Sequence, residues 1–109
     1  MKKSLKDIEV VSTSHNVGRK KVLLASNDSC CPITQVAITE LHSGERVEPH
    51  VHKDMQEGFY VMSGDLDIVL DEVVEHCHAE DFVWVKCGTC HELRAVTDVR
   101  IMTIGCEVI

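Results

Sequence analysis

Short apolar runs alternate with turn-forming residues along the whole chain, at intervals of about ten residues. Regularly spaced short strands with turn signals between them are typical of a β-sandwich or a β-barrel. The chain also contains 16 Val, 7 Ile and 6 Thr against 4 Ala, a mixture that suits pleated, half-buried surfaces better than helices. The pattern therefore predicts an all-β protein with little or no helix, folded as a closed antiparallel β-barrel or as a jelly roll.

The apolar runs define the expected strands. Clusters such as Asn27-Asp28-Ser29 and Ser63-Gly64-Asp65 separate them, and Gly, Asn, Asp and Ser supply the backbone angles that tight turns require. Since no linker, repeat or break in composition interrupts the pattern, residues 1–109 are expected to form a single domain. We expect strands at Lys21–Ala25, Ile33–Leu41, Arg46–His52, Gly58–Met62, Asp65–Leu70, Val73–His78, Phe82–Val85, His91–Val96 and Val99–Val108.

The charge of the chain argues against one class of partner. Its formal net charge is −7 and its longest basic run is Arg19-Lys20-Lys21, whereas binding to a phosphate backbone requires a basic face. No segment approaches the ~20 apolar residues that span a bilayer. The basic start of the chain is not followed by an apolar stretch, so it does not indicate a secretory signal. We expect a cytoplasmic protein without nucleic-acid or membrane partners.

The string CGTCH at residues 87–91 suggests two kinds of site. A C-x-x-C-H string attaches c-type haem, and two cysteines at this spacing also form half of a zinc site. Haem attachment lacks the export signal it requires. For zinc, an expected Val73–Val85 hairpin places Cys77 opposite Val83, ~13 Å from Cys87 at ~3.3 Å per residue, too far for one tetrahedral site. In a reducing cytoplasm the six cysteines are expected to be thiols, and a redox role of Cys87 and Cys90 stays open.

Two histidines and a glutamate form the constellation with the most chemical content. His50 and His52 are two residues apart, so on a strand they project to the same face. Glu57 opens the next expected strand, and pairing of the two strands would bring the three side chains together. Two imidazoles and a carboxylate suit a divalent first-row metal, because they combine nitrogen ligands of intermediate softness with one hard anionic oxygen. Fe, Mn, Ni, Zn and Cu are all compatible with this set.

The spacing of these residues resembles the first motif of the cupin family, Gly-x5-His-x-His-x4-Glu-x6-Gly. Residues 44–64 fill every fixed position of this motif, with Gly44, His50, His52, Glu57 and Gly64.

The second cupin motif, Gly-x5-Pro-x-Gly-x2-His-x3-Asn, is similar to residues 80–95 but less closely. Gly88 and His91 match it, while Glu80, Lys86 and Ala95 replace the first Gly, the Pro and the Asn. The short segment between the motifs is similar to that of compact microbial cupins.

The resemblance implies a jelly-roll barrel that holds one metal ion inside through three His and one Glu. Carried over by position, the ligands are His50, His52, Glu57 and His91, with two coordination positions open for water, substrate or dioxygen. His91 would then belong to the metal site rather than to the C-x-x-C-H string. The remaining histidines are expected to be surface residues: His15, His42, His76 and His78.

Alternation along the strands predicts the walls of the cavity around the metal. Either Phe82 or Trp84 is expected to point inward. The other expected apolar wall residues share a face with Glu57 or His91, and they are Phe59, Val61, Leu93 and Ala95. The polar candidates near the cavity are Gln35, Thr39, Glu40, Gln56 and Arg94.

Cupins include dioxygenases, sugar-phosphate isomerases, decarboxylases, lyases and proteins without catalytic activity, and the fold does not decide among them. We expect a small-molecule metalloenzyme of the dioxygenase type. A sugar or sugar-phosphate isomerase is an alternative, although only Lys53, Lys86 and Arg94 lie near the motifs to hold a phosphate. A non-catalytic, small-molecule-binding accessory protein is a further alternative.

The oligomeric state follows from the exposed edges of an isolated jelly roll, which favour pairing with a second copy. Cupins commonly dimerise. We therefore expect a homodimer, with the strand near Val22–Ala25 as a paired or exchanged edge.

Overall fold

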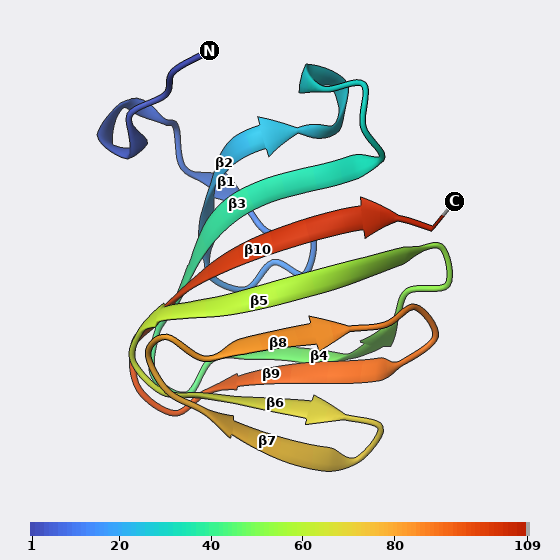
Figure 1. Ribbon diagram of the computed structural model, residues 1–109. Coiled ribbons are helices and arrows are strands. Elements are labelled where there is room, and N and C mark those ends of the chain that lie inside the picture. Colours follow the sequence, from blue (N-terminus) through green and yellow to red (C-terminus); the bar gives the residue numbers. More distant parts are fainter. Residues whose placement is uncertain (109) are drawn as a thin grey trace.

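The computed structural model describes residues 1–108 and consists almost entirely of antiparallel strands (Figure 1). Within these residues the only helical segments are two short 3-10 turns, η1 (Leu5–Asp7) and η2 (Ser26–Asp28). The strands are β1 (Val11–Ser12), β2 (Arg19–Ala25), β3 (Ile33–Leu41), β4 (Arg46–Val51), β5 (Met55–Ser63), β6 (Leu66–Leu70), β7 (Val73–Cys77), β8 (Phe82–Val85), β9 (Cys90–Ala95) and β10 (Val99–Glu107). The predicted all-β fold is therefore confirmed. In the described part of the chain, no helix has the length and apolar character that crossing a membrane requires.

The strands form two sheets. The larger sheet has the order β1-β2-β3-β10-β5-β8, and the smaller sheet has the order β4-β9-β6-β7. From β3 to β6, and again from β7 to β10, each strand lies in the sheet opposite to that of the strand before it. This repeated crossing is the jelly-roll arrangement that the sequence predicts. The barrel is not closed, because within residues 1–108 no ladder joins the two sheets.

Most strand positions agree with the sequence-based expectation, and β3 and β8 begin and end at the expected residues. The sequence missed β1, which pairs through only two residues with the start of β2 and is too short to show alternation.

The expected hairpin between β7 and β8 is wrong. β7 pairs with β6, whereas β8 pairs with β5 in the other sheet. The connecting segment crosses between the sheets because its backbone bonds to β5. The Glu80 N–H donates to the Val61 carbonyl, and the Val61 N–H donates to the Asp81 carbonyl.

The apolar core lies between the two sheets and fills one end of the space. The inward-facing residues of β5 run from Val61 through Phe59 to Glu57, and all three are buried. The inward-facing residues of β9 run from Ala95 through Leu93 to His91, and these are buried too. On both strands the interior thus changes from apolar side chains to the ionisable side chains of Glu57 and His91. Full burial of each large apolar side chain contributes ~1.5–3 kcal/mol, so the core anchors the strands that carry the polar end.

Candidate metal centre

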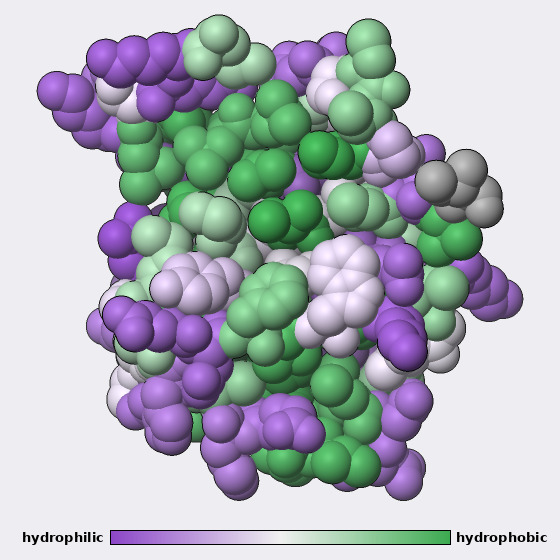
Figure 2. All heavy atoms as spheres, viewed as in Figure 1, coloured by the Kyte–Doolittle hydropathy of each residue, from purple (hydrophilic) through white to green (hydrophobic). Residues whose placement is uncertain are grey.

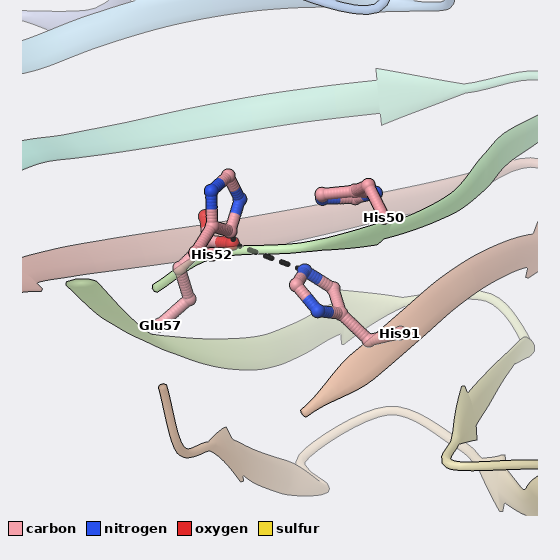
Figure 3. A group of neighbouring side chains, drawn as sticks. All are labelled: His50, His52, Glu57 and His91. Carbon is pink, nitrogen blue, oxygen red and sulfur yellow. Dashed lines mark hydrogen bonds and ion pairs between the residues drawn. The ribbon is translucent and has the colours of Figure 1, made fainter. Parts of the chain in front are cut away.

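The four predicted metal ligands converge at the polar end of the interior (Figure 3). His50 lies on β4, His52 directly after it, Glu57 on β5 and His91 on β9. One potential ligand atom from each residue lies within 4.8 Å of those of the other three. The structure therefore brings together a group of three imidazoles and one carboxylate that can hold a metal ion.

A bulge in β4 turns His50 toward the interior. Val47 pairs with Leu93 and His50 pairs with His91, so β4 advances three residues where β9 advances two. Strict alternation from the buried Val47 would instead place His50 on the outer face. Pro49 lies in this irregular stretch of an edge strand, where the missing N–H of proline breaks no ladder.

Two of the imidazole rings are oriented by backbone carbonyls. The Nδ1 atom of His50 lies 2.8 Å from the Glu48 carbonyl, and that of His91 lies 3.1 Å from the Thr89 carbonyl. Because a carbonyl can only accept, each Nδ1 is the donor. In the neutral ring the lone pair is then on Nε2, the arrangement that suits a metal-binding histidine.

The carboxylate of Glu57 lies at the centre of the group. Its Oε1 is 3.1 Å from His52 Nε2 and 3.2 Å from His91 Nε2. Burial would raise the pKa of Glu57, but the hydrogen bond that His91 Nε2 donates when the ring is protonated, together with the charges of the three rings, holds this pKa below its ordinary value. Burial would lower the pKa of His91, but the hydrogen bonds with Glu57 and the Thr89 carbonyl raise it. Glu57 is thus held as a carboxylate, the form that binds a metal.

A fifth histidine lies against the group. The ring of His15, in the connection between β1 and β2, is 4.3 Å from the ring of His50 and lines the same cavity. Its burial against the site lowers its pKa. Thr13 holds this connection in place, because its hydroxyl donates to the Val17 carbonyl at 2.6 Å and accepts from the Val17 N–H at 3.1 Å.

His15 is exposed, as predicted, and it also contacts the ring of His50. Its contact with His50 is long-range and leaves no signal in the sequence. His42, His76 and His78 are exposed as predicted. His76 pairs with Asp67 and His78 pairs with Asp65, both on the smaller sheet or next to it.

The cavity beside the candidate ligands has a volume of about 160 Å³. Phe59 and Leu93 line it as predicted, as do the polar candidates Gln35 and Thr39. The residues that the sequence prediction missed come mainly from the β1–β2 connection, β2 and β10, and they include Thr13, Ser14, Lys20 and Thr103.

Neither Phe82 nor Trp84 points into the cavity, so that prediction is wrong. Their side chains are 55% and 40% exposed. Val83 and Val85 pair with the inward-facing Phe59 and Glu57, so the alternate positions of β8 face outward. The two aromatic rings instead pack over Gly58 on the outer face of the larger sheet. Three polar candidates are also absent from the lining: Glu40, Gln56 and Arg94.

The cysteines do not join the candidate centre. Cys87 is exposed and Cys90 is half-buried, and both are free thiols, as is the buried Cys77. Among residues 1–108, the side chains that can hold a metal ion include no cysteine.

Fold and site together define a small jelly-roll protein with a candidate metal centre of three histidines and one glutamate between its sheets. The family model of the Cupin domain matches residues 37–105, which is more than half of the chain. The chain belongs to the cupin family.

Solved structures show the same fold at low sequence identity. A predicted oxalate decarboxylase from Thermotoga maritima has a TM-score of 0.86 and 19% identity, covering 99% of this chain and 100% of that one. Ectoine synthase from P. lautus has a TM-score of 0.84 and 17% identity, covering 97% and 77%. The polyketide cyclase RemF from Streptomyces resistomycificus has a TM-score of 0.80 and 13% identity, covering 98% and 78%. No curated protein sequence matches the chain. Because these structural relatives differ in activity, the likeness shows the fold alone.

Proposed function

We propose that residues 1–109 form a single cupin domain that binds one divalent transition metal ion through His50, His52, Glu57 and His91. The observation that carries this proposal is the convergence of one ligand atom from each residue within 4.8 Å. Three nitrogens and one carboxylate oxygen suit Fe, Mn, Ni, Zn or Cu. Burial of Glu57 and His91 supports the assignment, because burying ionisable groups is costly and here it places a carboxylate and an imidazole side by side at one internal site.

The proposed activity is that of a small-molecule metalloenzyme of the dioxygenase type. Four protein ligands leave coordination positions for small molecules, and a bound metal ion supplies a Lewis acid or a site for dioxygen. The chain's own residues support this by shielding the site from water, since Phe59, Leu93 and Ile101 form an apolar wall beside the candidate ligands.

The alternative of a sugar-phosphate isomerase has less support. Lys53, Lys86 and Arg94 do not line the cavity, and Lys20 is the one Lys or Arg among the lining residues of the described chain. A phosphate dianion is usually held by several cationic or backbone N–H donors. If the chain binds a metal ion but converts no substrate, the alternative of a non-catalytic binding protein is favoured.

Elemental metal analysis of the purified chain tests the proposal. The wild type is expected to contain about one transition metal ion per chain, and the double variant His50→Ala/His91→Ala to lose it. The double variant His76→Ala/His78→Ala is the matched control, because both residues are exposed histidines outside the group.

Since His91 is only 1% exposed, its replacement can also unfold the chain. His52→Ala, at a side chain that is 31% exposed, provides a second ligand variant with less risk to the fold. Bound iron or manganese with dioxygen uptake supports the dioxygenase type. A wild type that stays metal-free after reconstitution contradicts the metal assignment.

We propose that the chain forms a homodimer through the outer face of the larger sheet. This face carries Tyr60, Phe82 and Trp84, which are 37%, 55% and 40% exposed. Figure 2 shows apolar side chains gathered on this face. Exposed apolar surface of this kind is unusual on a monomer, and aromatic residues are enriched in interfaces between proteins. The edge at Val22–Ala25, which lies outside the β1–β2 pairs, remains the alternative interface.

A further inference from the structure

The cavity beside the candidate metal centre contains a lysine that neither cupin motif includes. Lys20 lies on β2, opposite Thr39 of β3, and its Nζ donates a 3.0 Å hydrogen bond to the Oε1 of Gln35. Lys20 and Gln35 both line the cavity. The lysine side chain therefore extends along the inner face of the larger sheet instead of into solvent.

Gln35 holds the lysine ammonium in the row of residues that contains Glu57. Gly105 of β10 pairs with Gln35 on one side and with Glu57 on the other. Neighbouring strands are ~4.8 Å apart, so the Cα atoms of Gln35 and Glu57 are separated by roughly 10 Å. The ammonium group and the candidate metal ligands thus lie on two sides of one small cavity.

The charges around the cavity favour an anion. Among its lining residues in the described chain, Glu57 is the one carboxylate and Lys20 the one Lys or Arg. With a divalent ion bound, a single carboxylate leaves one net positive charge, and Lys20 adds a second. The chain as a whole has a formal charge of −7, so with the ion bound this cavity would be a local cationic region on an acidic protein and would concentrate small anions.

The donor groups favour a carboxylate. An ammonium can only donate, so the Gln35 atom that faces Lys20 is the amide oxygen, and the amide NH₂ group of Gln35 remains a donor. The ammonium and this NH₂ group lie next to each other, which matches the two oxygens of a carboxylate. The cavity volume of about 160 Å³ is below the ~300–1,000 Å³ of pockets for drug-sized ligands, so the ligand is small.

We propose that Lys20 and Gln35 bind the carboxylate of a small organic acid whose other polar end faces the metal. This inference rests on the proposed metal-dependent function, and it adds the substrate class and the residues that select it. Lys20 would hold the acid in place, whereas the four metal ligands would hold the ion.

Calorimetric titration of the manganese-reconstituted protein with pyruvate tests the proposal. Pyruvate carries a carboxylate next to a carbonyl, and methyl pyruvate is its uncharged counterpart. Lys20→Met is expected to weaken pyruvate binding by about tenfold or more, because hydrogen bonds to charged groups are the strong ones. The same variant is expected to leave methyl pyruvate binding unchanged, and Lys20→Arg to restore most of the affinity for pyruvate.

Lys21→Met is the matched control. Lys21 is the next residue on β2, its Nζ bonds to the Leu5 carbonyl, and it does not line the cavity. Its replacement is expected to change the affinity for pyruvate less than about twofold, since a charge outside the cavity is screened by solvent. All variants are expected to keep the metal content and unfolding temperature of the wild type.

The possible failures are distinct. A wild type that takes up no metal overturns both the proposed function and this inference. A metal-loaded wild type that does not bind pyruvate, or a Lys20→Met variant that binds it as tightly, overturns the carboxylate proposal alone. Tighter binding of inorganic phosphate than of pyruvate also overturns it.

Discussion

The imidazole ring of His15 packs against that of His50, with ring centroids 4.3 Å apart and planes inclined at 43°. His50 is a candidate metal ligand, whereas His15 belongs to the connection between β1 and β2 and is not in the ligand group. The contact closes one side of the candidate site. It also restricts the ring of His50, which contacts the ring of His91 and the Glu48 carbonyl as well. His15 is therefore a positioning residue.

Replacement of His15 by alanine is expected to weaken metal binding by up to about tenfold. Loss of a group that orients a ligand typically costs 10–100-fold in affinity, and a packing contact without a hydrogen bond falls at the lower end. Competition with a chelator measures this. His42→Ala, which removes an exposed histidine from outside the cavity, is expected to have no effect. Equal metal affinities of His15→Ala and the wild type would contradict the positioning role.

Gly64 and Gly44, the two glycines at the ends of the first motif, differ in the space available for a side chain. Both have positive φ angles, +85° at Gly64 and +87° at Gly44. A Cβ atom at Gly64 would lie 2.0 Å from the Asp98 carbonyl oxygen, whereas at Gly44 it would meet nothing within 4 Å. The two positions therefore separate backbone strain from steric overlap.

Alanine at either glycine is expected to be destabilising, but Gly64→Ala more so. The left-handed backbone costs a residue with a Cβ roughly 1–2 kcal/mol, and this cost is common to both variants. At Gly64 the backbone must also move away from Asp98, which is expected to add at least ~1 kcal/mol, of the order of other overpacking effects. Chemical denaturation of the two variants measures the difference. Equal unfolding free energies would show that the turn relaxes around the new methyl group.

Glu92 is buried on the outer side of β9, where it has a different role from the ligands beside it. It is 5% exposed and accepts hydrogen bonds from Arg94 Nε at 2.8 Å, from Arg94 Nη2 at 3.1 Å and from Arg46 Nη2. The two hydrogen bonds from Arg94, together with the one from Arg46, hold the pKa of Glu92 below its ordinary value. The charged form of Glu92 thus stabilises the smaller sheet.

Glu92→Gln is expected to lower the unfolding free energy by about 1–3 kcal/mol at pH 7. Because the folded-state pKa of Glu92 is the lower one, its contribution is fully present above the unfolded-state pKa of about 4.3. The contribution is lost as the pH falls through the folded-state pKa. Denaturation at pH 7 and at about pH 3, compared with the exposed Glu75→Gln control, measures the trend. A difference that stays constant at acidic pH would contradict it.

The sequence predicts the candidate ligands because their spacing is local and fits a known motif. His50, His52 and Glu57 lie within eight consecutive residues of one strand, turn and strand. The alternation of apolar residues likewise locates β3 and β8 to the residue. The sequence does not reveal the bulge between Val47 and His50. The local pattern therefore does not show which face of β4 carries His50.

The sequence also does not predict contacts between distant segments. Lys20 belongs to a basic run that looks like a solvated surface, yet the pairing of β2 with β3 turns it toward Gln35 inside the cavity. Phe82 and Trp84 are the opposite case: one of them is expected to point inward, whereas the pairing of β8 with β5 turns both outward. Both orientations depend on which strands pair, and strand pairing is a property of the whole sheet.

The outward orientation of Phe82 and Trp84 leads to a prediction about assembly. If two copies pack through the outer face of the larger sheet, sedimentation gives a mass of about twice the 12.2 kDa of one chain. A lysine at Trp84 would bring a charge into the centre of this apolar contact. Trp84→Lys is therefore expected to weaken the dimer by about a hundredfold or more, an effect that is common when a large side chain at the centre of an interface is replaced.

Val73→Lys is the matched control for the dimer, because Val73 is an apolar strand residue that is 60% exposed on the smaller sheet. It is expected to leave the sedimentation mass unchanged, since the predicted contact does not include that sheet. A monomeric wild type would contradict the dimer. A dimer that tolerates Trp84→Lys would contradict the contact through the outer face and favour the free edge at Val22–Ala25 instead.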